Sequence, residues 1–306
     1  WHRKAGEPHA EVNAINSVKD KSLLKKATIY VSLEPCSHFG KTPPCANLIV
    51  DNSIKNVVVG IIDSNSKVSG AGVKYLKDNG CNVIVGVLEA ECKELNKRFF
   101  TFHTKKRPYI ILKWAETADG FIDKLRDESS ENLPNWISNQ YSQQRVHKIR
   151  AEEQAILVGT TTAINDNPNL NVRSWNGNNP IRVVLDRTLK IPKTYNLLDG
   201  NVQTIVLTEK LPNESFQKNI LFEEINFSNN VPKQICEVLF KHEIQSVIIE
   251  GGVQTLQSFI DKNLWDEAFV FVGNTFFGEG LKSPEVRKTP IKIEIISGDI
   301  LKEFIN

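Results

Sequence analysis

Short apolar segments rich in β-branched residues recur along the chain and alternate with segments of helical periodicity. We predict strands at residues 28–33, 56–62, 82–87, 109–114, 155–159, 181–186, 202–208, 246–250 and 267–272. Several are almost continuously apolar, which is typical of strands covered on both faces. Helices are predicted at residues 9–20, 44–52, 72–79, 89–101, 139–153, 233–241 and 255–262. This alternation predicts an α/β architecture with a mainly parallel sheet.

The length of the chain predicts two domains. At roughly 150 residues per domain, 306 residues suffice for two, each with its own core. The basic stretch at residues 103–108 ends in Pro108 and fits a solvated linker better than a basic binding patch. We therefore expect domains at residues 1–105 and 106–306. A polar stretch at residues 123–135 predicts a long loop in the second domain.

Charge and composition exclude several classes of protein. With 38 basic and 36 acidic residues, the net charge of +2 argues against a large nucleic-acid footprint. No apolar run approaches the ~20 residues that span a bilayer, and the start of the sequence lacks the apolar segment of a signal peptide. Five cysteines do not resemble a secreted disulfide framework, and we expect Cys81, Cys92 and Cys236 to be bystanders. We expect a cytoplasmic protein with neither nucleic-acid nor membrane partners.

Potential metal ligands gather in the first domain. The string His9-Ala10-Glu11 precedes a predicted strand that leads into Glu34-Pro35-Cys36, and Cys45 follows a Pro-Pro pair. The pattern H-x-E followed by P-C-x-x-C is the signature of zinc nucleobase deaminases, although here eight residues separate the two cysteines. Pro44 in a first helical turn would place Cys45 near a helix N-terminus, which favours a thiolate.

The donor set indicates a catalytic zinc ion. One imidazole and two thiolates leave the fourth tetrahedral position of Zn²⁺ open to water, so we predict His9, Cys36 and Cys45 as ligands. Zinc lowers the pKa of bound water to about 7. Glu11 is then placed to carry a proton from that water to the departing ammonia. A closed structural site is disfavoured because His38 is the one further ligand candidate. Each of these residues taken alone is more often structural.

The second domain lacks a Gly-x-Gly-x-x-Gly string, so an ordinary Rossmann fingerprint is absent. Two predicted strand-to-helix junctions offer other places for a phosphate. One is Glu250-Gly251-Gly252, and the other is Gly159 followed by three threonines. Glycines there let backbone N–H groups approach a phosphate. A Gly-Gly pair after a strand is more often only a turn, but two such junctions together favour a cofactor site.

The motifs resemble those of a known family. HAEVNAI and EPCSHFGKTPPC are similar to the deaminase half of the bifunctional riboflavin-biosynthesis deaminase–reductases, whose Cys-x8-Cys spacing separates them from cytidine and tRNA deaminases. In the second half, residues 113–120 resemble the family's reductase opening, with Thr117 for serine. Trp136-Ile137-Ser138 and residues 159–173 match further motifs, with Asn167 for aspartate. The resemblance covers nearly the whole chain.

This resemblance implies a fold and two reactions. The fold is a cytidine-deaminase-like α/β/α domain followed by a dihydrofolate-reductase-like α/β domain. The first reaction is zinc-dependent hydrolytic deamination of 2,5-diamino-6-(5-phosphoribosylamino)pyrimidin-4(3H)-one, and the second is NADPH-dependent reduction of the ribosyl group to a ribityl chain. Family members begin with a helix and a strand pair that precede Trp1, so we expect the N-terminal domain to be incomplete in this sequence. A homo-oligomer is also implied.

The same resemblance implies site residues. In the first domain the substrate contacts are His38, Lys41, Asp63 and Asn65. The serines after Asp63 and Asn65 replace family prolines, so the loop loses two fixed φ angles. In the second domain the NADPH contacts are Ala115, Trp136, Thr162, Asp166, Gly252, Val253, Gln254, Thr255, Leu256, Gln257 and Ser258. The substrate contacts there are Arg150, Leu170, Arg173 and Glu250.

Three side chains of the second domain carry more specific expectations. Lys113 assists proton transfer if burial lowers its pKa, or it pairs with Glu250 instead. Two arginines suit a 5′-phosphate because a guanidinium binds phosphate oxygens bidentately. Arg150 alone could equally cap the end of its helix. A contact at residues 133–135 is left open, because Leu133-Pro134-Asn135 stands where a Ser-Gln pair is common.

Other functions stay open at this point. A reductase with an impaired deaminase domain fits the incomplete N-terminal domain. A nucleic-acid or nucleoside zinc deaminase requires basic and aromatic residues around the zinc, which the near-neutral charge disfavours. A binding protein with a structural zinc is the third alternative. Incubation with the diaminopyrimidinone, with and without NADPH, separates these alternatives when ammonia release and NADPH loss are measured.

Overall fold

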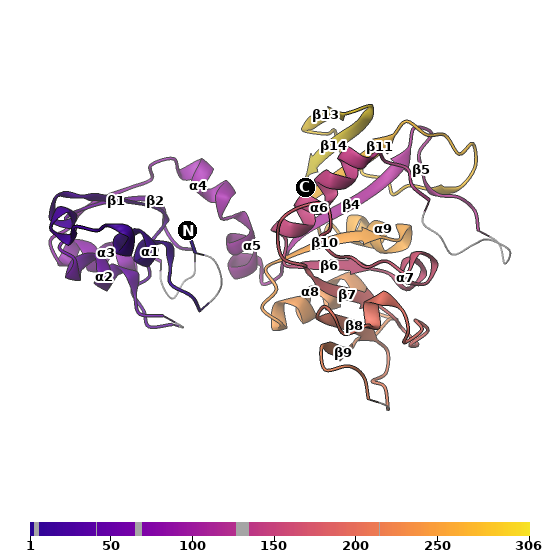
Figure 1. Ribbon diagram of the computed structural model, residues 1–306, viewed down its shortest axis with the longest axis horizontal. Coiled ribbons are helices and arrows are strands. Elements are labelled where there is room, and N and C mark those ends of the chain that lie inside the picture. The colour runs from indigo at the N-terminus through magenta and orange to yellow at the C-terminus, as the bar shows by residue number, and fades with distance from the viewer. Residues whose placement is uncertain (3–5, 41, 65–68, 127–134, 214) are drawn as a thin grey trace. The chain divides into compact units, whose positions relative to one another are not determined.

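The computed structural model describes every residue except 3–5, 41, 65–68, 127–134 and 214. The chain divides into two compact units, Trp1–Lys105 and Lys106–Asn306 (Figure 1). Both units combine helices with a largely parallel sheet, so the predicted α/β class is confirmed. Among the described helices, none combines the length and the apolar character needed to cross a membrane.

The first unit is built on a parallel sheet of order β1-β2-β3. Its strands are β1 (Thr28–Leu33), β2 (Asn56–Ile61) and β3 (Asn82–Val85). Its helices are α1 (Ala10–Ser17), the 3-10 helix η1 (Lys21–Lys26), α2 (Cys45–Asp51) and α3 (Ala71–Asp78). Helices connect the strands, as parallel pairing requires. Ile15, Ile49 and Leu76 from the three α-helices pack on Val57 and Val59 of β2, and this core holds the helices against the sheet.

The end of the first unit differs from the expectation. The predicted helix at residues 89–101 is two helices, α4 (Glu89–Leu95) and α5 (Lys97–Lys105), separated at Asn96. Phe100 and Phe102 are buried, and their packing stabilises the second helix, which ends at Lys105. The predicted solvated linker at residues 103–108 is therefore wrong in part, because its first half is helical. Arg107, in its second half, is largely buried and pairs with Asp266.

The second unit contains a nine-stranded sheet of order β13-β14-β11-β4-β10-β6-β7-β8-β9 (Figure 1). Its strands are β4 (Tyr109–Thr117), β6 (Ala155–Val158), β7 (Ile181–Leu185), β8 (Thr204–Thr208), β9 (Ile220–Glu224), β10 (Ser246–Gly251), β11 (Glu267–Gly273), β13 (Lys292–Ile296) and β14 (Asp299–Ile305). The seven strands from β11 to β9 are parallel, whereas β14 and β13 are antiparallel. A small second sheet pairs β5 (Phe121–Asp123) with β12 (Leu281–Lys282).

Helices cover both faces of this sheet. α8 (Val231–Lys241) and α9 (Val253–Asp261) pack on one face, and α6 (Gln140–Glu152) and α7 (Thr160–Asp166) pack on the other. Strand β6 shows why its sequence is continuously apolar. Ala155 and Leu157 enter the first core, whereas Ile156 and Val158 enter the second. This layered arrangement brings the ends of β4, β10, β6 and β7 to one side of the second unit.

Candidate active sites

Three potential metal ligands meet in the first unit. His9 is the N-cap residue of α1, Cys36 follows β1, and Cys45 is the first residue of α2. His9 Nδ1 lies 3.7 Å from Cys36 Sγ and 3.3 Å from Cys45 Sγ. All three ligand atoms lie within 4.8 Å of one another, and no second such group occurs among the described residues. The structure thus brings together the three residues whose spacing predicted a zinc site.

The two thiols lie close enough to share a hydrogen bond. Their mutual hydrogen bond lowers the pKa of Cys36 to about 6 and raises that of Cys45. The backbone N–H of Cys45 also donates to Cys36 Sγ at 3.3 Å, which helps to hold a thiolate there. Two thiolates and one imidazole suit Zn²⁺ and leave one coordination position free for water.

Glu11 and Thr42 complete the surroundings of these ligands. Glu11 lies in the first turn of α1, and its carboxylate is close enough to contribute to the raised pKa of Cys45. Thr42 Oγ1 lies 3.2 Å from His9 Nε2, a contact that sequence reasoning did not anticipate. A partner on the outer nitrogen orients a ligating imidazole, so Thr42 helps to turn Nδ1 toward the sulfurs.

Glu34 is a further residue that sequence reasoning missed. Glu34 is 4% exposed, and within the described chain its carboxylate accepts four backbone N–H groups. Oε2 accepts from Asp63 at 3.1 Å and from Gly70 at 2.9 Å, and Oε1 accepts from Gly72 at 2.8 Å and Val73 at 3.0 Å. Glu34 therefore fixes both ends of the segment that carries Asp63. The only advance signal was its position two residues before Cys36.

The structure describes only two of the four predicted substrate contacts of the first unit, Asp63 and His38. Asp63 is buried, where Glu34 holds its backbone, and His38 is exposed in the loop between the two cysteines. Lys41 and Asn65 lie outside the described residues. The serine that follows Asp63 belongs to the described chain, but the loop beyond it does not.

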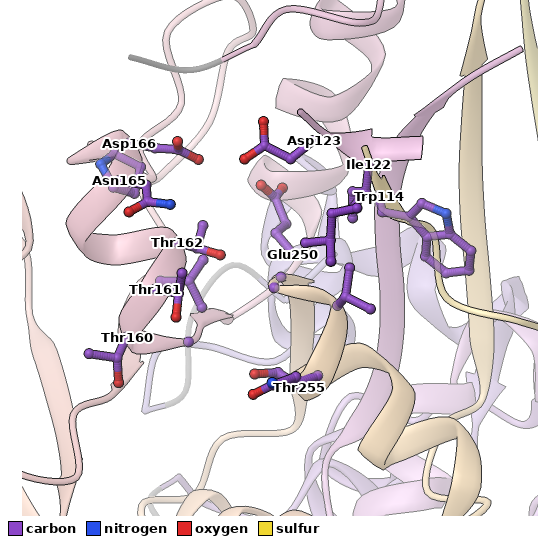
Figure 2. Close-up of a pocket in the computed structure, with 18 of the residues that line it drawn as sticks. Trp114, Ile122, Asp123, Thr160, Thr161, Thr162, Asn165, Asp166, Glu250 and Thr255 are labelled. Atoms are coloured by element: carbon purple, nitrogen blue, oxygen red, sulfur yellow. The ribbon is translucent and has the colours of Figure 1, made fainter. Parts of the chain in front are cut away.

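A cavity of about 1400 Å³ lies in the second unit, at the ends of β4, β10, β6 and β7. Figure 2 shows Thr160, Thr161 and Thr162 of α7 on one wall, Glu250 between the walls, and Thr255 of α9 at the lower end. Most of the predicted NADPH and substrate residues line it: Lys113, Ala115, Trp136, Arg150, Thr162, Asp166, Leu170, Arg173, Glu250, Gly252, Val253, Gln254, Thr255 and Ser258.

Two residues predicted to contact NADPH do not line this cavity. Leu256 is fully buried in the core between α9 and the sheet. Gln257 donates to Asp261 at 2.8 Å and accepts the backbone N–H of Glu285 at 2.9 Å. The run from Gly252 to Ser258 belongs to a helix, and successive helical side chains point in different directions, so part of the run faces away.

The two predicted glycine junctions adjoin each other. Gly159 N–H donates to Gly251 O at 2.8 Å, so the start of α7 lies beside the start of α9. A side chain at Gly159 would place its Cβ 2.9 Å from Thr255 Oγ1, and one at Gly252 would place it 3.2 Å from Thr162 Oγ1. The glycines therefore expose backbone next to threonine hydroxyls, an arrangement suited to the pyrophosphate of a dinucleotide.

A buried ion pair network lies at the centre of the cavity. Glu250 accepts two hydrogen bonds from Arg150, at 2.9 and 2.6 Å, and its Oε2 lies 3.9 Å from Lys113 Nζ. Burial opposes ionisation of Glu250, but Arg150 and Lys113 outweigh it and bring the pKa to about 2. Burial also lowers the pKa of Lys113, against the attraction of Glu250. Lys113 thus pairs with Glu250 and also has a lowered pKa, and its role in proton transfer stays a prediction.

A second cationic group adjoins this network. Arg173 donates from Nη1 to Asn171 Oδ1 at 2.8 Å, and its backbone N–H donates to His147 Nδ1 at 3.2 Å. Burial and the nearby Arg150 lower the pKa of Arg173, so an anion bound here would stabilise both guanidinium groups. Burial and the same arginines lower the pKa of His147 to about 4, which keeps it a neutral acceptor.

Acidic residues occupy the opposite edge of the cavity. Arg126 donates to Asp123 at 2.9 Å and to Asp166 at 3.3 Å, and Asn135 donates to Asp123 at 2.6 Å. Figure 2 shows Asp123 and Asp166 facing each other from the two walls. Burial raises the pKa of Asp166 despite Arg126. Trp136 lines the same region and is 65% exposed, whereas Leu133 and Pro134 lie outside the described residues.

Comparisons with known proteins cover both units. A family model for the RibD C-terminal domain matches residues 108–297, and one for the zinc-binding region of cytidine and deoxycytidylate deaminases matches residues 2–61. The riboflavin biosynthesis protein RibD of Aquifex aeolicus is 41% identical over 324 residues, covering 99% of this chain and 87% of that protein.

Two solved structures resemble the chain along nearly all of its length. The diaminohydroxyphosphoribosylaminopyrimidine deaminase/5-amino-6-(5-phosphoribosylamino)uracil reductase of Thermotoga maritima is 37% identical with a TM-score of 0.84, covering 97% of this chain and 85% of that chain. RibD of Acinetobacter baumannii is 31% identical with a TM-score of 0.86, covering 99% and 87%.

The matched regions contain both sites. The zinc-binding region includes His9, Cys36 and Cys45, and the RibD C-terminal domain includes all the residues that line the cavity. The predicted fold class and family are confirmed. The chain belongs to the RibD family of bifunctional deaminase and reductase enzymes of riboflavin biosynthesis.

Proposed function

We propose that residues 1–105 deaminate 2,5-diamino-6-(5-phosphoribosylamino)pyrimidin-4(3H)-one and that residues 106–306 reduce the ribosyl group of the product with NADPH. The observation that carries this assignment is the presence of two chemically distinct sites in one chain. The first is a His-Cys-Cys cluster beside Glu11, and the second is a large cavity around Lys113, Arg150 and Glu250.

In the proposed deamination, His9, Cys36 and Cys45 hold Zn²⁺, and Thr42 orients the imidazole. Bound zinc supplies a water molecule whose pKa is lowered to about 7. Glu11 accepts the proton of this water and returns it to the nitrogen that leaves as ammonia. His38, Lys41, Asp63 and Asn65 are the proposed substrate contacts, of which Lys41 and Asn65 lie outside the described residues.

In the proposed reduction, Arg173 binds the 5′-phosphate. Arg150 already donates hydrogen bonds to Glu250 and to the Asn171 carbonyl oxygen. We therefore assign Arg150 to holding Glu250 in place and to balancing its negative charge. Glu250 accepts hydrogen bonds from sugar hydroxyls. Lys113 gives a proton to the ring oxygen when the ribosyl ring opens. NADPH supplies the hydride that reduces the resulting C1′=N bond.

The deciding experiment follows ammonia and NADPH separately with the full chain. The diaminopyrimidinone alone should release ammonia, and NADPH should then be consumed only after deamination. NADPH oxidation with the deaminated substrate, but no ammonia from the first substrate, would support the alternative of a reductase with an impaired deaminase domain. Failure of both steps would contradict the proposal.

Cellular context belongs to the same proposal. We expect a cytoplasmic enzyme that acts on a small molecule and forms a homo-oligomer, without nucleic-acid or membrane partners. The nearly balanced charge supports the absence of nucleic acid, because phosphate backbones bind to strongly basic surfaces. Sedimentation at several protein concentrations tests the oligomer, and a single monomeric species would contradict it.

A further inference from the structure

The cavity of the second unit spans four neighbouring strands. Lys113 belongs to β4, Glu250 to β10, Val158 to β6 and Leu185 to β7, and these strands are adjacent in that order. Neighbouring strands lie ~4.8 Å apart, so the line from β4 to β7 covers about 14 Å. The nicotinamide must reach the sugar near Lys113 and Glu250. The adenosine end of the same cofactor would then extend toward β7.

Arg187 lies at this far end, two residues after β7. Six cationic side chains among the described residues line the cavity: Lys113, Lys124, Arg126, Arg150, Arg173 and Arg187. Of these six, only Arg187 comes from the segment that directly follows β7. Its side chain is 53% exposed, so a ligand can reach it. Leu185, Phe227 and Val231 give the same end an apolar wall that suits an adenine ring.

Glu209 already holds the Arg187 guanidinium in place. Arg187 Nε donates to Glu209 Oε2 at 3.0 Å, and Nη2 donates to Oε1 at 2.9 Å. A guanidinium has five N–H groups, so three are left for another acceptor. The guanidinium carbon also lies 5.9 Å from the centre of the Phe227 ring. An exposed pair of this kind contributes little free energy, so the pairing with Glu209 does not prevent Arg187 from binding a phosphate through its remaining N–H groups.

We propose that Arg187 binds the 2′-phosphate that distinguishes NADPH from NADH and so determines the coenzyme preference of the reductase. A guanidinium matches phosphate oxygens in charge and in planar geometry. This inference rests on the proposed NADPH-dependent reduction. It goes beyond it by naming the residue that selects the phosphorylated coenzyme.

Binding of two adenosine fragments tests Arg187 without catalysis. The full chain is titrated calorimetrically with 2′,5′-ADP and with 5′-ADP, which differ only in the 2′-phosphate. The intact protein should bind 2′,5′-ADP more tightly than 5′-ADP. Arg187→Ala should weaken the binding of 2′,5′-ADP by about tenfold or more and leave the affinity for 5′-ADP unchanged. Arg287→Ala is a matched control, because Arg287 also pairs with a glutamate but does not line the cavity.

Kinetics provide a second readout. Arg187→Ala should raise KM for NADPH, leave KM for NADH unchanged and change kcat little. An undiminished preference for 2′,5′-ADP in Arg187→Ala would overturn the inference. Equal weakening of both fragments would also overturn it, because Arg187 would then support the adenosine site as a whole. An intact chain that neither binds nor oxidises NADPH would instead contradict the proposed reductase function itself.

Discussion

The metal cluster of the first unit depends on its three ligands and on two residues that bind no metal, Thr42 and Glu34. His9, Cys36 and Cys45 carry a motif whose chemistry is specific, and the structure brings them within coordination range. Thr42 and Glu34 carry no comparable signal, because a hydroxyl or a carboxylate serves many purposes. Their roles emerge only from contacts with segments far along the chain, such as the amides of Gly72 and Val73.

Glu34→Gln should impair substrate binding to the deaminase more than zinc binding. The amide keeps one acceptor oxygen, so two of the four backbone N–H groups lose their partner and the segment of Asp63 loosens. Because hydrogen bonds to a charged group contribute about 1.5–3 kcal/mol, KM for the pyrimidine should rise by about tenfold or more. Metal analysis and reductase assays should match those of the exposed control Glu91→Gln. An unchanged KM would show that Glu34 does not position this segment.

The ionised state of Glu250 predicts acid sensitivity of the second unit. Its pKa is depressed from 4.5 to about 2, so the stabilisation is complete above pH 4.5 and is lost as pH falls from there toward 2. Four of the five tryptophans lie in this unit, so fluorescence reports its unfolding. In Glu250→Gln the dependence on pH in this window should be weaker. An identical dependence would mean that other groups control acid unfolding.

At the scale of elements, the sequence predicts the buried central strands better than the limits of the helices or the strands near the edges of the sheets. β6 and β10 have continuous apolar sequences because both of their faces are buried. By contrast, the strand-to-helix junction at Gly159 was predicted but the extent of α7 was not, since its three threonines have low helix propensity. The helix is held by the packing of Ala163 in the core. β13 exposes Ile293 and Ile295, so its sequence does not mark it as a buried strand. β9, β12, β13 and β14 pair with partners that the local sequence does not identify.

Gly72→Ala should separate α3 from the metal-ligand segment. A Cβ at this buried position would lie 2.0 Å from the Pro35 carbonyl oxygen, so the backbone must move. We expect loss of deaminase activity and a lower unfolding temperature of the first unit, with reductase activity retained. Gly40→Ala is the control for stability, since its Cβ meets only ordinary contact at 3.9 Å. Equal stability of the two variants would contradict this packing argument.

At the scale of the whole molecule, the two sites lie in separate compact units, each with its own core. The α/β class and the position of the metal cluster follow from sequence patterns. The cavity does not, because its walls come from residues between Lys113 and Leu281 that only the sheet topology brings together. For the same reason, sequence reasoning did not show that Leu256 and Gln257 lie away from the cavity, and their contact with NADPH stays a prediction.

Removal of zinc should affect one reaction only. A chelator that withdraws the metal from His9, Cys36 and Cys45 should abolish ammonia release, and added Zn²⁺ should restore it. Reduction of the deaminated substrate should continue, because the described cavity of the second unit contains no cluster of metal ligands. Loss of NADPH oxidation on chelation, measured with deaminated substrate, would show that the two units depend on one another.

The most direct test of two independent sites is a paired assay of Glu11→Gln in the full chain, with the exposed Glu7→Gln as its control. The side chain keeps its size but can no longer accept a proton. The account predicts bound zinc, ammonia release reduced by about a hundredfold or more, and normal NADPH oxidation with the deaminated substrate. Normal ammonia release, or the loss of both reactions with zinc still bound, would contradict it.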